Sequence, residues 1–293
     1  MDLKGIYPPI TTPFKDEEVD FAGLESNVSR YMATGVAGVV VLGSNGEAPH
    51  LSESEARAVV EAVRARVPKG RWLIAGAGHY STRETIAAAR DAAKAGADLV
   101  LVKTPGYFKA MMTQEAFIRH FTAVADASPV PVILYDCPMF TGVSLQAATV
   151  ARLAEHPNIA GIKESAPDIA LVADFVTLTP ASFQVVVGSA PTLFASLAVG
   201  AVGGIVALAC VLPDLCVRLH TLVGQQRWVE ALDLQRRLTP LARSITSAYG
   251  VGGLKAALDM AGYVGGLPRM PLVRPGPEGI ETIKNQIAAL AEV

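Results

Sequence analysis

Residues 72–105 read WLIAGAGHYSTRETIAAARDAAKAGADLVLVKTP. Two short and almost wholly apolar runs, 72–78 and 98–105, flank a longer segment with the amphipathic pattern of a helix. Ser81 followed by Glu84 matches a capping box, which predicts where that helix begins. Apolar strands joined through a helix are typical of a parallel sheet that is buried on both faces.

The same alternation of short and long segments extends over most of the chain. Six further strand-like runs lie at residues 5–14, 38–44, 131–138, 159–165, 183–190 and 203–209. Eight strands with intervening helices are the number required for a (β/α)8 barrel, and we predict that fold. A doubly wound open sheet is the alternative, but no GxGxxG motif follows the first strand.

The C-terminal part of the chain differs from the repeating units. Its residues are polar and helical in pattern, and Gly- and Pro-rich turns interrupt them. We predict a catalytic barrel at residues 1–224 and a C-terminal helical extension at residues 225–293. The apolar run 193–212 is long enough to cross a membrane. However, its Gly-Ala-Val-Gly-Gly centre instead predicts a helix, a turn and a buried strand.

Composition excludes several classes of partner. The formal net charge is -2 and no run of lysine or arginine occurs, so we expect neither a nucleic-acid nor a membrane partner. Cys137, Cys210 and Cys216 lack CxxC spacing, which favours reduced core thiols in a cytoplasmic protein over disulfides or zinc. The five histidines are scattered, which disfavours a metal-dependent aldolase.

Polar residues collect at the predicted carboxyl ends of the strands, where barrel enzymes carry their catalytic groups. On the sixth strand, Gly161, Lys163 and Ser165 alternate and should share the inward face. The full set of strand-end residues is Thr11, Thr12, Ser44, Asn45, Glu47, Thr104, Tyr107, Tyr135, Lys163, Ser165, Gly188 and Ser189.

Lys163 stands in the apolar run NIAGIKES, where a charged amine is costly to bury. A desolvated lysine has a lowered pKa and forms Schiff bases with carbonyl groups. A neighbouring tyrosine, Tyr135, can carry protons, and the turn GSNGE can hold a carboxylate on its backbone N–H groups. This combination indicates covalent catalysis on a small 2-oxo acid, with no metal or organic cofactor.

Each of these residues also has an ordinary structural explanation. Lys163 could extend its amine to solvent, Tyr135 could be a core aromatic, and GSNGE could be a simple turn before a helix. Thr11 and Thr12 could be β-branched strand residues. Their predicted convergence at one end of one barrel favours the catalytic interpretation.

Five ordered motifs, PPITTPF, GSNGE, TPGYF, YDCPMFTG and GIKES, resemble the dihydrodipicolinate synthase / N-acetylneuraminate lyase superfamily. Its members are (β/α)8 barrels and class I pyruvate aldolases, commonly homotetramers built as dimers of dimers. The resemblance implies that Lys163 forms the Schiff base and that Tyr135 is the catalytic tyrosine. It also implies that Ser44 relays protons and that Tyr107 reaches across a subunit interface to complete a neighbour's site.

Two departures bear on the substrate. Synthases of this superfamily generally have Thr-Thr where this chain has Ser44-Asn45, and a carboxylate-binding arginine where it has Phe140. The Ser44-Asn45 pair, together with the motifs KES, GSA and VGAVGG, is similar to the 4-hydroxy-2-oxoglutarate aldolase branch. Phe140 disfavours a dihydrodipicolinate synthase, and it also makes the distal pocket more apolar than a dicarboxylate would prefer. The substrate-binding residues implied by the resemblance are Asn45, Thr11, Thr12, Ser165, Gly188, Ile205 and Phe140.

We therefore predict a carbon-carbon lyase that cleaves 4-hydroxy-2-oxoglutarate to pyruvate and glyoxylate. In this reaction Lys163 attacks the 2-oxo group, and Tyr135, assisted by Ser44, removes the proton from the C4 hydroxyl. The alternatives are a keto-deoxy sugar acid aldolase or dehydratase, a hydratase-aldolase of aromatic pyruvates, and dihydrodipicolinate synthase. A 2-oxo-acid-binding protein on a barrel that has lost its activity is the non-enzymatic alternative.

Overall fold

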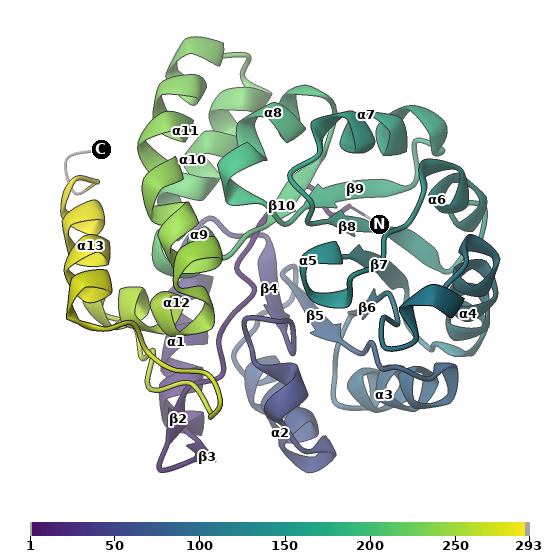
Figure 1. The fold of residues 1–293 in the computed structure, drawn as a ribbon, viewed down its shortest axis with the longest axis horizontal. Helices are drawn as coiled ribbons and strands as arrows, with labels where there is room; N and C mark the ends of the chain where they lie inside the picture. The colour runs from purple at the N-terminus through teal and green to yellow at the C-terminus, as the bar shows by residue number, and fades with distance from the viewer. Residues whose placement is uncertain (1, 291–293) are drawn as a thin grey trace.

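The computed structural model describes residues 2–290, and eight parallel strands form the centre of the molecule (Figure 1). Around the sheet, β1 is followed by β10 and then by β9, with the remaining strands in descending order to β4. The two ends of this sheet meet, because Ile10 N donates to Val40 O at 2.9 Å and Val40 N donates to Pro8 O at 3.0 Å. The predicted (β/α)8 barrel is confirmed. The strands are β1 (Gly5–Tyr7), β4 (Gly38–Val41), β5 (Trp72–Gly76), β6 (Leu99–Lys103), β7 (Val132–Asp136), β8 (Ile159–Glu164), β9 (Gln184–Val187) and β10 (Gly203–Ile205).

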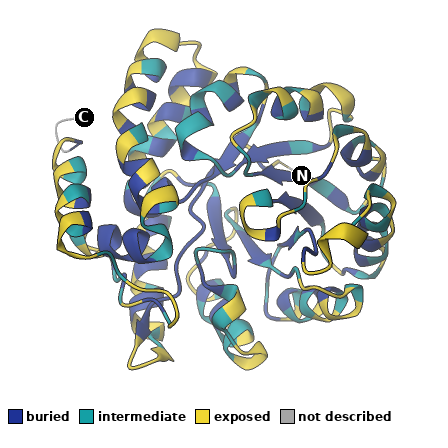
Figure 2. Cartoon of the chain, viewed as in Figure 1, coloured by how far each residue is buried: buried dark blue, intermediate teal, exposed yellow. Residues whose placement is uncertain are grey.

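Helices surround the barrel and cover its outer face. Figure 2 shows the strands buried and the outward sides of the helices exposed. The helices that follow the strands are α1 (Phe21–Met32), α2 (Glu53–Arg64), α3 (Thr82–Lys94), α4 (Gln114–Ala127), α6 (Ala147–Leu153), α7 (Ile169–Leu178), α8 (Leu193–Ala198) and α10 (Pro213–Gly224). Shorter elements are the hairpin β2 (Phe14–Lys15) and β3 (Glu18–Val19) and the one-turn helices α5 (Pro138–Thr141) and α9 (Leu208–Val211).

Three further helices follow the barrel units: α11 (Trp228–Arg243), α12 (Gly250–Met260) and α13 (Pro277–Ala288). Helix α11 packs on α10 and α8, and α12 packs on α13 and α9. Figure 1 shows α13 at the edge of the molecule, beyond α11 and α12. The C-terminal helical extension is therefore present, while its predicted boundary at residue 224 stays a prediction about domains.

The apolar core has two layers because side chains alternate along each strand. On β6, Leu99 and Leu101 point into the barrel, whereas Val100 and Val102 pack against the surrounding helices. The inner layer continues upward to Tyr135 on β7. The inward-facing residues at the carboxyl end of each strand therefore lie at the open end of the barrel.

Local boundaries differ from the sequence prediction in two ways. The first predicted strand, 5–14, ends at Tyr7, because Pro8 and Pro9 lack the N–H groups that a ladder needs. The predicted capping box at Ser81 is half formed: within residues 2–290 its hydroxyl accepts from Glu84 N, and no return bond is made. A complete capping box lies instead at the start of α2.

The apolar run 193–212 has the predicted order of helix, turn and strand, as α8, β10 and α9. Within residues 2–290, no helix combines the length and apolar character needed to span a membrane. Cys137, Cys210 and Cys216 are all buried and form no disulfide within residues 2–290.

Candidate active site

Lys163 is the last residue but one of β8, at the carboxyl end of the strand inside the barrel. Its side chain is 6% exposed, and its Nζ lies 4.2 Å from the centroid of the Tyr135 ring. Burial lowers the pKa of Lys163 to about 8, although the nearby thiols of Cys137 and Cys210 act in the opposite direction. Near neutral pH, this amine is therefore unprotonated, and so nucleophilic, far more often than that of an ordinary lysine.

Gly188, just after β9, provides the space that this lysine occupies. A Cβ atom at Gly188 would lie 2.9 Å from Lys163 Cε and 2.0 Å from Ser165 Oγ. Any larger residue would displace either Lys163 or Ser165. This contact explains why a glycine is required at the end of the strand beside Lys163.

Tyr135 is the neighbour of Lys163 on β7, and the two are Cα partners across the sheet. Burial raises the pKa of the Tyr135 phenol, while hydrogen bonds with Ser44 and Ser165 oppose that rise. The phenol therefore keeps its proton and is linked to two hydroxyl groups from other strand ends. The structure thus brings together the lysine, the tyrosine and both serines that the sequence singled out.

The GSNGE loop after β4 is held against the end of β1. Thr12 Oγ1 donates to Gly46 O at 2.8 Å, and Asn45 Nδ2 donates to Pro9 O at 3.4 Å. Thr11 is also buried, and its hydroxyl has no hydrogen-bond partner among residues 2–290. Both threonines therefore line the junction between the first two strand ends.

Glu47 fixes the same loop from the opposite side. Its backbone is left-handed, with φ +54°, and its buried carboxylate lies 2.6 Å from Lys255 Nζ on α12. The other carboxylate oxygen accepts from Arg269 N at 3.0 Å. A left-handed glutamate is uncommon and costs on the order of 1 kcal/mol. The buried ion pair therefore holds this strained loop in place.

The remaining predicted residues are placed in different ways. Ile205 lies inside the barrel, in the same apolar layer as Tyr135. Tyr107 is 70% exposed and makes edge-on ring contacts with Tyr80 and Phe108. Phe140, on α5, is 65% exposed. Within residues 2–290, the structure does not bring Tyr107 or Phe140 into contact with the lysine and its partners.

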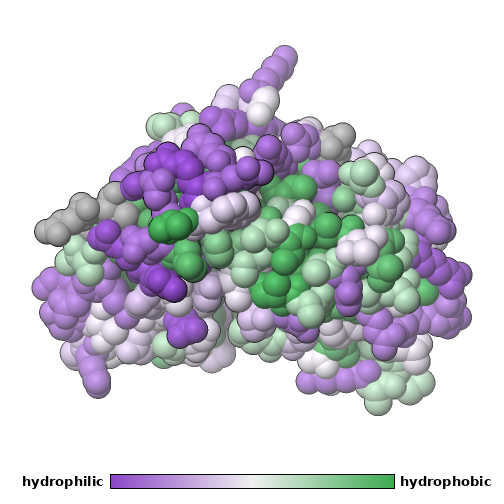
Figure 3. Space-filling model, turned by 90° about the horizontal axis from the view of Figure 1, so that it is seen from above, coloured by the Kyte–Doolittle hydropathy of each residue, from purple (hydrophilic) through white to green (hydrophobic). Residues whose placement is uncertain are grey.

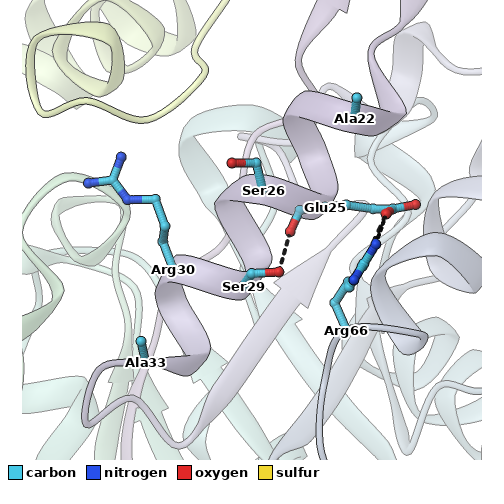
Figure 4. A pocket seen from close by; sticks show the side chains of 7 residues that line it. All are labelled: Ala22, Glu25, Ser26, Ser29, Arg30, Ala33 and Arg66. Carbon is cyan, nitrogen blue, oxygen red and sulfur yellow. Dashed lines mark hydrogen bonds and ion pairs between the residues drawn. The ribbon is translucent and has the colours of Figure 1, made fainter.

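A surface depression of about 640 Å³ lies elsewhere, along the outer side of α1 (Figure 4). Of its charged groups, Glu25 and Arg66 pair with each other and Arg30 donates to Ala261 O. The Ser29 hydroxyl donates to Glu25 O. These groups satisfy one another, so the depression offers no reactive centre. The strand-end cluster remains the candidate active site.

The sequence profile described as the dihydrodipicolinate synthetase family matches residues 2–290. The chain belongs to this family. A 4-hydroxy-tetrahydrodipicolinate synthase of Nitrobacter hamburgensis is 39% identical, over 97% of this chain and 95% of the relative. A solved dihydrodipicolinate synthase structure superimposes with a TM-score of 0.93 at 34% identity, over 99% of this chain and all of its own.

Membership in the dihydrodipicolinate synthetase family also establishes the type of protein. The chain is an enzyme of the class I, pyruvate-dependent type that acts on small molecules, so the interpretation as an inactive binding protein is wrong. The predicted 4-hydroxy-2-oxoglutarate aldolase activity is also wrong as the main function. One relative with that name, a probable mitochondrial enzyme of Emericella nidulans, is 35% identical over 99% of this chain and 96% of its own. Relatives at 35–39% identity are instead named 4-hydroxy-tetrahydrodipicolinate synthase.

Three residues beside the site of this family member were not predicted from its sequence. Lys103 is the last residue of β6. It lies directly beside Tyr135, because the two are Cα partners across the sheet. Asp136 and Glu164 follow Tyr135 and Lys163 in the chain and point to the opposite face. Lys103 could have been found in the same way as Lys163, because each is a lysine at the end of an apolar strand-like run. The two acids could have been found as adjacent strand ends that both carry carboxyl groups.

Asp136 and Glu164 form a fully buried carboxyl pair behind Tyr135 and Lys163. Ser144 Oγ donates to Asp136 Oδ2 at 2.6 Å, and Ala166 N donates to Glu164. Burial and the neighbouring charge of Asp136 raise the pKa of Glu164 to about 8, and burial raises that of Asp136 as well. One proton is therefore retained between the two carboxyl groups near neutral pH.

This pair predicts a pH-dependent stability. Between the ordinary glutamate pKa and about 8, the folded chain binds more protons than the unfolded chain, so the free energy of unfolding falls as pH rises. Glu164→Gln keeps a hydrogen-bond donor but has no proton to lose. We expect the wild type to lose about 2 kcal/mol or more between pH 5 and 8.5 relative to Glu164→Gln.

Urea unfolding at pH 5, 7 and 8.5 measures this difference. The exposed Glu155→Gln variant is the control, and its pH profile should follow that of the wild type. Equal pH dependence in the wild type and in Glu164→Gln would contradict the shared proton.

Proposed function

We propose that this chain is a 4-hydroxy-tetrahydrodipicolinate synthase that condenses pyruvate with a four-carbon aldehyde. The names of the most similar relatives support this assignment. The product name specifies a seven-carbon dicarboxylic acid with a ring nitrogen. Removing the three carbons of pyruvate leaves 2-amino-4-oxobutanoate, which carries one carboxylate and the amine that closes the ring.

The single observation that carries the proposal is the buried amine of Lys163, stacked on the Tyr135 ring. In the proposed reaction this amine attacks C2 of pyruvate, and loss of water gives an iminium ion. Loss of a C3 proton gives an enamine, whose C3 forms a bond to the aldehyde carbon. The amine of the second substrate then displaces Lys163 from C2. The overall reaction consumes pyruvate and the aldehyde and releases one water.

Tyr135 is proposed as the proton carrier. Its phenol stays protonated and is linked with Ser44 and Ser165, so it can give a proton to the aldehyde oxygen as the bond forms. The serines can return a proton to the phenol through the same hydrogen bonds. This role requires the tyrosine to stand between the imine and the aldehyde, beside Lys163.

The pyruvate carboxylate is proposed to lie on the GSNGE loop. The N–H groups of Gly46 and Glu47 already donate to Gly43 O and Ser44 O. Those of Ser44 and Asn45 have no acceptor within residues 2–290. Consecutive free N–H groups favour an anion. We propose that four further residues close the pocket around the same substrate: Thr11, Thr12, Gly188 and Ile205.

Product analysis tests this function. Pyruvate and 2-amino-4-oxobutanoate are incubated with the enzyme, and both substrates and the cyclic product are followed by NMR. We expect equimolar loss of the two substrates and no reaction without pyruvate. Faster consumption of pyruvate with glyoxylate than with the amino aldehyde would overturn the assignment.

We further infer that the enzyme acts as a homotetramer in the cytoplasm. Large apolar side chains are exposed near the open end of the barrel, including Tyr107 and Phe140, which would need a partner to be covered. Figure 3, seen from the side of α7, α8 and α11, shows a second broad apolar area. Tyr107 would then reach the site of a neighbouring copy. The three unpaired thiols suit a reducing compartment.

Sedimentation velocity measures the assembly. We expect a single species of four chains at micromolar concentration, and Tyr107→Ala should favour smaller species. A stable monomer with full activity would contradict this inference.

A further inference from the structure

A second lysine, Lys103, lies inside the barrel and has no part in the steps described above. It is the Cα partner of Tyr135, which is in turn the partner of Lys163. The two lysines therefore flank the tyrosine in one row across β6, β7 and β8. Because Leu99 and Leu101 point into the barrel, the alternation along β6 turns Lys103 inward as well.

Gly78, just after β5, makes room for this lysine. A Cβ atom at Gly78 would lie 2.7 Å from Lys103 Cγ and 2.6 Å from its backbone nitrogen. This arrangement parallels the contact between Gly188 and Lys163. In both cases a glycine at the end of the neighbouring strand leaves space for a lysine side chain inside the barrel.

The amine of Lys103 has one hydrogen-bond partner in the described structure, the carbonyl oxygen of Gly78. No carboxylate within residues 2–290 lies within ion-pair distance of it. Burial lowers the pKa of Lys103. A half-buried ammonium group with a single neutral partner is poorly compensated, and a bound anion would supply the missing charge.

Two other cations near this end of the barrel already have carboxylate partners. Lys255 pairs with Glu47, and Arg269 Nη1 donates to Glu55 Oε2 at 3.1 Å. Phe140 offers no charge at all. Lys103 is therefore a cation that remains available to a substrate at the strand ends.

We propose that Lys103 binds the carboxylate of the aldehyde substrate and thereby selects acceptor aldehydes that carry a negative charge. This proposal rests on the proposed synthase function. The order of groups across the sheet supports it: Lys163 holds the imine, Tyr135 faces the new hydroxyl, and Lys103 lies beyond it. The condensed molecule carries its imine, its hydroxyl and its second carboxylate in the same order. The bond to Gly78 directs the Lys103 amine towards β5, away from Lys163.

The charge of the aldehyde provides the decisive comparison. With saturating pyruvate, kcat/KM is measured for 2-amino-4-oxobutanoate and for its neutral methyl ester, using the wild type, Lys103→Met and Lys103→Arg. We expect Lys103→Met to lose at least about tenfold with the acid and less than twofold with the ester. Lys103→Arg should recover part of the loss. The exposed Lys69→Met variant, just before β5 at the opposite end of the barrel, should match the wild type with both aldehydes.

A binding measurement separates this proposal from the proposed function. Enzyme reduced with borohydride in the presence of pyruvate is titrated with 2-aminobutanoate, an unreactive analogue of the aldehyde, in a calorimeter. The wild type should bind at least about tenfold more tightly than Lys103→Met. Equal binding, or equal losses with the acid and the ester, would overturn the role of Lys103. Weaker trapping of pyruvate in Lys103→Met would also overturn it, because Lys103 would then bind pyruvate and not the aldehyde. Failure of the wild type to trap pyruvate would instead refute the synthase mechanism, and the same titration of untreated enzyme would still test Lys103.

Discussion

Replacing Lys163 with methionine is expected to abolish turnover and to remove the covalent adduct with pyruvate. Methionine has a similar length and no amine, so the pocket beside Gly188 stays filled while the nucleophile is lost. Wild-type enzyme treated with pyruvate and sodium borohydride should gain the mass of one reduced pyruvate per chain. Intact-mass spectrometry and peptide mapping should place that mass on Lys163, and the variant should gain none.

The rate of trapping should also depend on pH in a defined direction. The unprotonated amine is the reactive form, and burial lowers its pKa to about 8. The rate of imine formation should therefore rise with pH up to about 8 and then level off. An ordinary exposed lysine would continue to gain reactivity to about pH 10.

Lys103 is a second lysine inside the same barrel, so the experiment must show which of the two lysines reacts with pyruvate. Lys103→Met is the matched control, and it should still be trapped on Lys163. An adduct that persists in Lys163→Met and maps to Lys103 would contradict the assignment of the nucleophile.

The largest expected loss of stability comes from replacing Lys255 with methionine. The variant leaves the carboxylate of Glu47 buried without its cation, at a side chain that is wholly inaccessible to solvent. Loss of one partner of such a pair costs about 3–5 kcal/mol. The same carboxylate holds the loop that carries Ser44 and Asn45, so we also expect a weaker affinity for pyruvate.

Urea unfolding at a fixed protein concentration measures this loss. Lys284→Met is the matched control, because that lysine is exposed on α13 and, within residues 2–290, pairs with exposed Glu281. Its effect should stay below about 0.5 kcal/mol. The double variant Glu47→Gln with Lys255→Met removes both charges and should recover much of the stability. A single Lys255→Met variant as stable as the control would contradict the structural role of the pair.

Much of the fold and part of the site could be predicted because their signals are local. The apolar runs and the amphipathic segments between them indicated the barrel, and the barrel indicated which strand ends converge. Lys163, Tyr135, Ser44 and Ser165 were found in this way, and the structure brings them together. The substrate could not be obtained by the same reasoning. Phe140 stands where synthases have a carboxylate-binding arginine, and its lack of charge disfavoured the synthase function. A positive charge can, however, be supplied by a residue of a neighbouring strand.

The sequence by itself thus determined the (β/α)8 barrel, the lysine in its sixth strand and the hydroxyl groups around it. Periodicity and the order of strands carry this information along the chain. Only the tertiary structure decided that Lys103 stands beside Tyr135 with no carboxylate of residues 2–290 at ion-pair distance, that Glu47 meets Lys255, and that Asp136 lies against Glu164. The physical reason is that the cost of a buried charge depends on which groups surround it. Those groups come from distant segments whose register is set only when the barrel closes.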